Sequence, residues 1–281
     1  MTRQSSAYDR ARSMMPERSR TPFFTPSLLA GRAALVTGGG TGICRGIALA
    51  LASVGCDVAI TSRRAEHLEP TVADIAAIGV RAFARAGDVR RPEEVEGVVA
   101  GAVDAFGRLD ILVNGAAGNF IALAENLSPN GFGTVVDIDL KGTFNVSRAV
   151  YPHLKARGGA ILNISATLQL LGTVGQSHAA AAKAGVDSLT RTLASEWGPA
   201  GIRVNGLAPG PVAGTEGVRR LVTGEARRGI DAQCPLRRMA TIEEVADAAV
   251  FLCSDAASFI TGVTLVIDGG LWLRSSHALG T

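Results

Sequence analysis

Residues 33–53 read AALVTGGGTGICRGIALALAS, and this stretch decides the fold. Its first five residues predict a short buried strand, and the Ala- and Leu-rich end is typical of a packed helix. Gly38 and Gly42 allow the chain between them to turn sharply and to approach a ligand closely. The start of the helix would present free backbone amides to a pyrophosphate. Cys44 stands where such a loop usually has a third glycine for close helix packing.

Strand-like and helix-like segments alternate along the rest of the chain. Further strands are predicted over residues 56–61, 82–86, 109–113, 204–208 and 263–267, and one begins at Ala160. Helical apolar stripes lie within residues 92–106 and 242–253. This alternation predicts one Rossmann-like domain, a doubly wound parallel sheet of about seven strands with helices on both faces, over residues 28–275. Residues 1–27 are expected to be a disordered tail and residues 276–281 a C-terminal tail.

Composition excludes several classes of protein. The 28 basic and 25 acidic residues give a net charge of +3, which is too small to indicate a nucleic-acid partner. No uncharged apolar run approaches about 18 residues, so no membrane span is expected. The four cysteines show no metal-binding spacing, and we expect them to be reduced and no metal to be bound. With no readable targeting signal, the expected location is the cytoplasm.

The predicted strand over residues 56–61 runs into Ser62-Arg63-Arg64. At this place a site for an unphosphorylated dinucleotide usually has an acidic residue for the ribose hydroxyls. An arginine instead favours a 2′-phosphate through a charge-assisted contact, so we expect NADPH rather than NADH. The alternative is that these arginines belong to a solvated loop.

The motifs together resemble the short-chain dehydrogenase/reductase family. They comprise residues 37–42, Asp88, residues 114–118, Lys183, Asn205, Pro209-Gly210 and residues 268–270, in the family's order and spacing. The resemblance implies that Asp88 lies near the adenine, that Asn114 braces the central strand and that Pro209-Gly210 flanks the nicotinamide. The residues expected to bind the cofactor are Gly38, Thr41, Gly42, Ile43, Arg63, Arg64, Asp88, Val89, Asn114, Ala116, Lys183, Pro209 and Gly210.

The residues with which this family usually reduces a ketone are missing. The position of its tyrosine acid, four residues before Lys183, holds Ala179, and the position of its serine holds Ala166. The asparagine position holds Asp139. Alanine donates no proton, and loss of a positioned acid removes about a hundred- to ten-thousand-fold in rate. Either the protein binds a nucleotide without catalysis, or it reduces a conjugated thioester, in which the proton lands on carbon.

One branch of the family has this pattern. Residues 114–120, 137–147, 176–183, 196–199, 207–211 and 214–217 resemble the 2,4-dienoyl-CoA reductases, most closely the peroxisomal type. The resemblance implies NADPH-dependent reduction of a 2,4-dienoyl-CoA to a 3-enoyl-CoA in the β-oxidation of unsaturated fatty acids. In this branch Lys183 and Asp139 would be catalytic. The lysine would hold the nicotinamide ribose, and the carboxylate would pair with Lys183 and orient a water. Asn119, Phe120, Thr167 and His178 would contact the acyl-CoA, although structural roles remain open for them.

A glycine-punctuated segment, residues 211–230, follows the strand over residues 204–208 and is typical of a mobile lid. Its residues Arg219 and Arg220 are expected to meet the phosphates of CoA, unless they form an ordinary solvated helix face. The family usually assembles as homodimers or homotetramers, which is the expectation here. Two rivals to the dienoyl-CoA reductase remain: another acyl-thioester or ketone reductase with Thr167 as substitute acid, and a catalytically silent nucleotide-binding protein.

Overall fold

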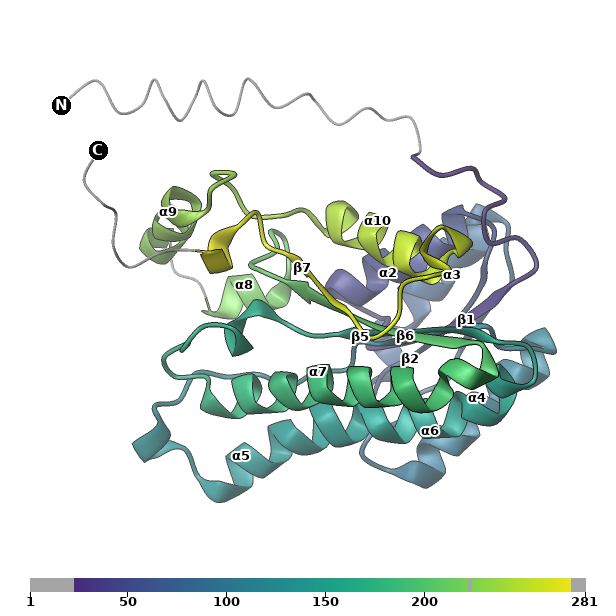
Figure 1. Cartoon of the computed structure of the whole chain (residues 1–281), viewed down its shortest axis with the longest axis horizontal. Helices are drawn as coiled ribbons and strands as arrows, with labels where there is room; N and C mark the ends of the chain where they lie inside the picture. The colour runs from purple at the N-terminus through teal and green to yellow at the C-terminus, as the bar shows by residue number, and fades with distance from the viewer. Residues whose placement is uncertain (1–22, 222–223, 274–281) are drawn as a thin grey trace.

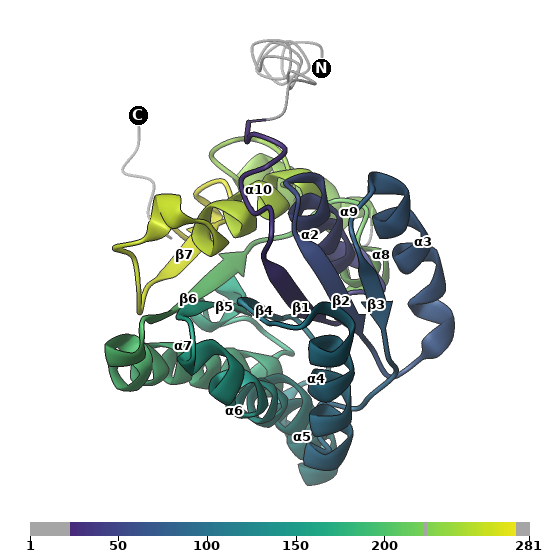
Figure 2. The same cartoon turned by 90° about the vertical axis from the view of Figure 1, so that its right-hand side faces the viewer.

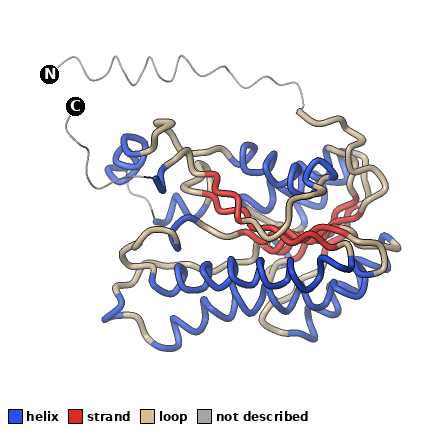
Figure 3. Tube along the Cα trace, in the orientation of Figure 1, coloured by secondary structure: helices blue, strands red, loops and turns tan. Residues whose placement is uncertain are grey.

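The computed structural model describes residues 23–221 and 224–273, and in this part of the chain seven strands form one parallel sheet in the order β3-β2-β1-β4-β5-β6-β7. The strands are β1 (Ala33–Thr37), β2 (Asp57–Thr61), β3 (Ala82–Ala84), β4 (Ile111–Asn114), β5 (Gly159–Ile164), β6 (Ile202–Pro209) and β7 (Thr264–Ile267). Figure 1 shows the sheet edge-on, and Figure 3 shows the strands between two layers of helices. The predicted doubly wound architecture is confirmed.

Helices cover both faces of the sheet. The helices are α2 (Gly42–Ser53), α3 (Glu69–Ile78), α4 (Pro92–Phe106), α5 (Pro129–Val136), α6 (Gly142–Lys155), α7 (Ser177–Trp197), α8 (Glu216–Leu221), α9 (Gly224–Gln233) and α10 (Ile242–Cys253). Helices α4, α6 and α7 lie on one face, and α2, α3 and α10 lie on the other (Figure 2).

Two apolar cores hold the layers together, one on each face of the sheet. Ile47, Leu51 and Val250 are fully buried against the face that α2 and α10 cover. Val150 and Leu154 of α6 are buried against the opposite face, together with the apolar stripe of α4. That stripe consists of the residues that the helical periodicity predicts: Val95, Val98, Val99, Ala102 and Phe106. Strands buried on both faces explain why the chain is rich in Ala, Val and Leu.

The order of the strands determines where a ligand can bind. Strand β1 lies between β2 and β4, so the chain leaves β1 toward one edge of the sheet and later builds the other half from β4. At such a switch point the loops after the two strands diverge and leave a crevice at the carboxyl ends. The loops that border this crevice are the glycine loop after β1 and residues 115–120 after β4.

Some boundaries differ from the prediction. Strand β3 ends at Ala84 rather than at residue 86, although the amides of Arg85 and Gly87 still bind the carbonyls of Ile60 and Ser62 on the neighbouring chain segment. At the N-terminus, Phe24 packs against the core. The domain bounds, residues 28–275, stay a prediction. The predictions for residues 1–22 and 276–281 lie outside the described residues.

Candidate active site

The glycine loop between β1 and α2 passes close to the end of β4. The hydroxyl oxygen of Thr37 accepts hydrogen bonds from the amides of Gly115 at 2.9 Å and Ala116 at 3.1 Å. Gly38 has a φ of +69°, and a Cβ built there would lie 2.9 Å from the carbonyl oxygen of Gly115. Both observations explain why this position requires glycine: the backbone is left-handed and the neighbouring loop is in contact.

The structure accounts for Cys44 in place of a third glycine. A Cβ on Gly115 would lie 2.0 Å from the Sγ of Cys44, so the space that the thiol fills is provided by a glycine in the facing loop. Burial raises the pKa of the Cys44 thiol to about 12, so it stays protonated and unreactive at neutral pH. The substitution therefore preserves the close packing of α2 against the loop after β4.

A cleft of about 410 Å³ opens at the crevice between these loops. It is lined by Gly38, Gly40, Thr41, Thr61, Ser62, Arg63, Arg64, His67, Gly87, Asp88, Val89, Ala116, Ala117, Gly118, Asn119, Ile138 and Glu216. Seven of the predicted cofactor residues are among them. The glycine cradle, the start of α2 at Gly42 and the hydroxyl of Thr61, which is buried without a hydrogen-bond partner among the described residues, fit a dinucleotide.

The charged end of this cleft carries both signs. Arg63 and Arg64 are exposed at its border, where the sequence predicts contact with a 2′-phosphate. Asp88 is held by Arg90, with the closest nitrogen and oxygen atoms 2.5 Å apart. The hydrogen bond from Arg90 holds the pKa of the Asp88 carboxyl below its ordinary value of 3.8, so the group is ionised at neutral pH. Arg90, which pairs with this cleft residue, is not among the residues that the sequence singled out.

The two predicted catalytic residues form a buried ion pair. The Nζ of Lys183 lies 3.2 Å from Oδ2 of Asp139, and their side chains are 10% and 2% exposed. Lys183 also donates a hydrogen bond to the carbonyl oxygen of Ile164 at 2.8 Å. The second carboxylate oxygen of Asp139 accepts the amide of Gly118 at 2.7 Å. Both charges are thus paired and hydrogen-bonded, which is the condition for burying them.

Asp139 reaches this position from an irregular turn of helix. Residues Asp137–Lys141 form a π-helical turn, η3, between α5 and α6. The hydroxyl of Thr143 donates to the carbonyl oxygen of Asp139 at 2.6 Å within this region. Single π-helical turns inside helices occur frequently at functional sites, since the extra residue redirects a side chain. Here the turn leaves Asp139 buried and Asp137 half exposed.

The positions of the missing acid and serine are apolar, as the sequence indicates. Ala179 is buried in a small cluster with Val135 and Ala182. Beside Ala166, the hydroxyl of Ser165 is buried without a hydrogen-bond partner among the described residues. Thr167 is also buried, at the start of a short 3₁₀ turn, η4 (Thr167–Gln169). Within the described residues, the surroundings of Lys183 therefore contain hydroxyls, and the position four residues before it holds no tyrosine.

The predicted substrate residues Asn119, Phe120 and His178 come together. The rings of Phe120 and His178 lie 4.4 Å apart between centroids, with an interplanar angle of 37°. His178 is fully buried, and neither ring nitrogen has a hydrogen-bond partner in the described part of the chain. Asn119 donates to the side chain of Gln176 at 3.0 Å, whereas its buried Oδ1 has no partner among these residues. Unsatisfied buried polar atoms of this kind mark places for ligand groups or ordered water.

The remaining predicted residues are distributed as follows. Asn114 is buried at the end of β4 and donates to Ser147 and Asn163, each at 2.9 Å, so it joins the central strand to its neighbours. Pro209 and Gly210 lie at the carboxyl end of β6, and Ile43 lies in the first turn of α2. Arg219 is exposed on α8. The side chain of Arg220 lies outside the described residues.

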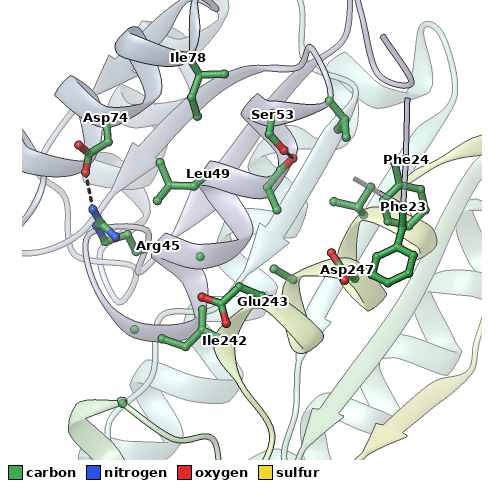
Figure 4. A pocket seen from close by; sticks show the side chains of 17 residues that line it. Phe23, Phe24, Arg45, Leu49, Ser53, Asp74, Ile78, Ile242, Glu243 and Asp247 are labelled. Carbon is green, nitrogen blue, oxygen red and sulfur yellow. Dashed lines mark hydrogen bonds and ion pairs between the residues drawn. The ribbon is translucent and has the colours of Figure 1, made fainter. Parts of the chain in front are cut away.

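A second cavity, of about 950 Å³, lies between α2, α3 and α10 (Figure 4). It is lined by apolar residues such as Leu49, Ile78 and Ile242, and the ion pair of Arg45 and Asp74 joins α2 to α3 at its side. Gly42 is the one predicted cofactor residue that lines it, and the Asp139–Lys183 pair does not. This cavity is therefore not the candidate active site.

No helix in residues 23–221 or 224–273 is long and apolar enough to cross a membrane.

The family model described as enoyl-(acyl carrier protein) reductase matches residues 38–272. Together with the parallel sheet and the dinucleotide cleft, this match defines a nicotinamide-dependent oxidoreductase, and the chain belongs to the short-chain dehydrogenase/reductase family.

Within this family, several relatives carry one name. The peroxisomal 2,4-dienoyl-CoA reductase of Arabidopsis thaliana is 45% identical, over 91% of this chain and 89% of its own length. The protein of the same name from Danio rerio is 46% identical, over 92% of this chain and 87% of its own. Both are named as producing (3E)-enoyl-CoA.

Solved structures support the same fold. The citronellol catabolism dehydrogenase of Pseudomonas aeruginosa has a TM-score of 0.79 and 38% identity, covering 89% of this chain and 98% of that chain. A short-chain type dehydrogenase/reductase from Mycobacterium marinum has a TM-score of 0.83 and 31% identity, covering 88% and 97%.

Proposed function

We propose that this protein is an NADPH-dependent 2,4-dienoyl-CoA reductase that forms a 3-enoyl-CoA during the oxidation of unsaturated fatty acids. The observation that carries the proposal is the buried Asp139–Lys183 pair beside a position that lacks the tyrosine acid. Relatives at 45–46% identity, named as producers of (3E)-enoyl-CoA, support the substrate and the product.

When bound, the reduced nicotinamide supplies a hydride to the far end of the conjugated dienoyl thioester. The charge that develops on the thioester oxygen requires nearby donors or positive charge rather than a tyrosine. Lys183 provides a fixed positive charge because Asp139 and the carbonyl of Ile164 hold its ammonium group. We assign to Lys183 the binding of the nicotinamide ribose and the electrostatic stabilisation of the enolate.

Asp139 is assigned the orientation of the water that protonates the α-carbon. Its carboxylate is fixed from two sides, by the Gly118 amide and by Lys183, so a water bound to it would have a defined position. The buried polar atoms of Ser165, Asn119 and His178 that lack partners among the described residues provide sites for the polar groups of the thioester.

The choice of NADPH is supported by Arg63 and Arg64, which line the cleft, and by the absence of Asp or Glu directly after β2.

We also propose assembly as a homodimer or homotetramer, supported by exposed apolar side chains such as Phe132 and Phe144 on α5 and α6. The cytoplasmic location stays a proposal from the sequence, although several relatives are named as peroxisomal.

The test is NADPH consumption with 2,4-hexadienoyl-CoA, followed by identification of the product by NMR. We expect 3-enoyl-CoA from the wild type and loss of turnover in Lys183→Ala. Lys155→Ala, which removes an exposed lysine of α6, serves as the matched control and should retain activity. Tight NADPH binding without turnover would instead support the silent nucleotide-binding protein. A (2E)-enoyl product, which the name of the Bacillus subtilis probable 2,4-dienoyl-CoA reductase states, would contradict the proposed position of protonation.

A further inference from the structure

An exposed apolar rim is carried by the loops that follow the backbone partners of the Asp139–Lys183 pair. Two loops form it: residues 119–124 after β4 and residues 167–176 after β5. Its exposed side chains are Ile121, Leu123, Leu170, Leu171 and Val174. Val174 is 80% exposed and Ile121 is 57% exposed. Large apolar side chains gathered at a surface usually mark a site of interaction.

The two loops form one surface because hydrogen bonds and a close contact hold them together. The amide of Ala122 donates to the carbonyl oxygen of Gly175 at 2.9 Å. Asn119 and Gln176 form a side-chain hydrogen bond at 3.0 Å. A Cβ on Gly175 would lie 2.9 Å from a methyl carbon of Ile121, so Gly175 permits the close contact between the loops.

The rim is continuous with the candidate active site. Its first loop begins directly after Gly118, whose amide binds Asp139. Its second loop begins at buried Thr167, shortly after Ile164, whose carbonyl binds Lys183. The rim and the reactive pair are thus joined through the backbone of both loops.

The rim and the dinucleotide cleft differ in their content of charged residues. Residues 111–124 and 159–182 contain no Asp, Glu, Lys or Arg. In contrast, Arg63, Arg64 and Asp88 are among the residues that line the cleft. The polar groups of a cofactor fit the cleft, whereas only an apolar chain gains by contact with the rim.

We infer that the rim binds the distal part of the substrate's acyl chain and makes the enzyme prefer medium and long chains. This inference rests on the proposed function. In a 2,4-dienoyl-CoA the reacting carbons lie near the thioester, so a six-carbon chain has one carbon beyond the diene. Every further carbon must extend away from the reactive pair, and the charge-free rim is an apolar surface on the loops that begin beside this pair.

The expected gain follows from the cost of hydrating methylene groups. Full burial of one methylene raises the binding constant about fourfold. An open rim that covers half of the methylene raises it about twofold. From six to ten carbons, kcat/KM of the wild type is therefore expected to rise about sixteenfold.

The experiment measures kcat/KM with six-, eight- and ten-carbon 2,4-dienoyl-CoA substrates, below their micelle concentrations. The test variant is Ile121→Ser/Val174→Ser, which removes two exposed side chains and does not open the core. We expect it to lose most of the rise with chain length, about tenfold for the ten-carbon substrate, and to turn over the six-carbon substrate within twofold of wild type. The matched control is Val263→Ser, because Val263 is 44% exposed but lies before β7, at the amino end of that strand.

Four results would overturn the inference. A flat chain-length profile in the wild type, with good six-carbon turnover, would overturn it and leave the proposed function intact. Equal losses for all chain lengths in the double variant would show that the loops only position the active site. A change of oligomeric state in the double variant, measured by sedimentation, would show that the rim is a contact between subunits. Absence of wild-type turnover with every dienoyl-CoA would overturn both the inference and the proposed function.

Discussion

Replacement of Asp139 by asparagine tests the central feature of the proposed mechanism. The substitution keeps the shape of the side chain and an oxygen that can accept the Gly118 amide at 2.7 Å. It removes the negative charge that lies 3.2 Å from the Lys183 ammonium group. We expect kcat with 2,4-hexadienoyl-CoA to fall about a hundred- to ten-thousand-fold, the usual contribution of a positioned proton-transfer group.

The effect on stability can be separated from the effect on catalysis. Removing one member of a buried ion pair costs about 3–5 kcal/mol, and the lower end applies because Lys183 keeps its hydrogen bond to Ile164. A loss of about 3 kcal/mol lowers Tm by about 6–12 °C in a domain of this size. Against a typical stability of about 5–15 kcal/mol, most molecules stay folded at 25 °C, so unfolding alone does not explain a hundredfold loss.

The assay is steady-state NADPH oxidation at saturating substrate, with Tm measured on the same samples. Asp137→Asn is the matched control, because Asp137 lies in the same π-helical turn with a half-exposed side chain and should lose less than twofold. In the double variant Asp139→Leu/Lys183→Met, apolar residues replace the pair, so stability should recover while activity does not. Turnover of Asp139→Asn within threefold of wild type would refute the role of the carboxylate in orienting water.

Three further predictions concern the cleft and the buried ring. Arg63→Ala should lower the ratio of NADPH to NADH efficiency at least tenfold, since it removes a charge-assisted contact to the 2′-phosphate; an unchanged ratio contradicts the cofactor assignment. His178→Phe keeps a ring next to Phe120 but removes both nitrogens, so we expect about a tenfold lower kcat, whereas wild-type turnover would limit His178 to packing. Arg90→Ala should raise the pKa of Asp88 toward 3.8. Because the folded-state pKa is lowered, the stabilisation is present above about pH 4 and disappears as the pH falls below 3.8. At pH 7 the variant should therefore unfold at a lower urea concentration than the wild type, and this difference should be much smaller at pH 3.

The sequence alone determined the architecture, because local patterns carry that information. A strand that ends in a glycine loop and runs into an Ala-rich helix requires backbone turns and packing that few other structures provide. The apolar stripe over residues 92–106 predicts the buried face of α4 correctly, since helical periodicity is a local property. The same holds for chemistry that depends on one position: Ala179 excludes a tyrosine acid without any knowledge of its neighbours.

The geometry of the site was decided by tertiary structure. Asp139 and Lys183 are 44 positions apart in the sequence, and their 3.2 Å contact depends on how η3 and α7 pack. No sequence pattern marked the Gly118 amide or the Ile164 carbonyl, because every residue has such groups and only the fold selects which of them meet a side chain. The tilted contact between the rings of Phe120 and His178 and the hydrogen bonds that join two loops into an apolar rim have the same origin. Periodicity and composition state which residues are present, but the order of strands in the sheet decides which loop ends lie together, and so which of these residues can act on one substrate.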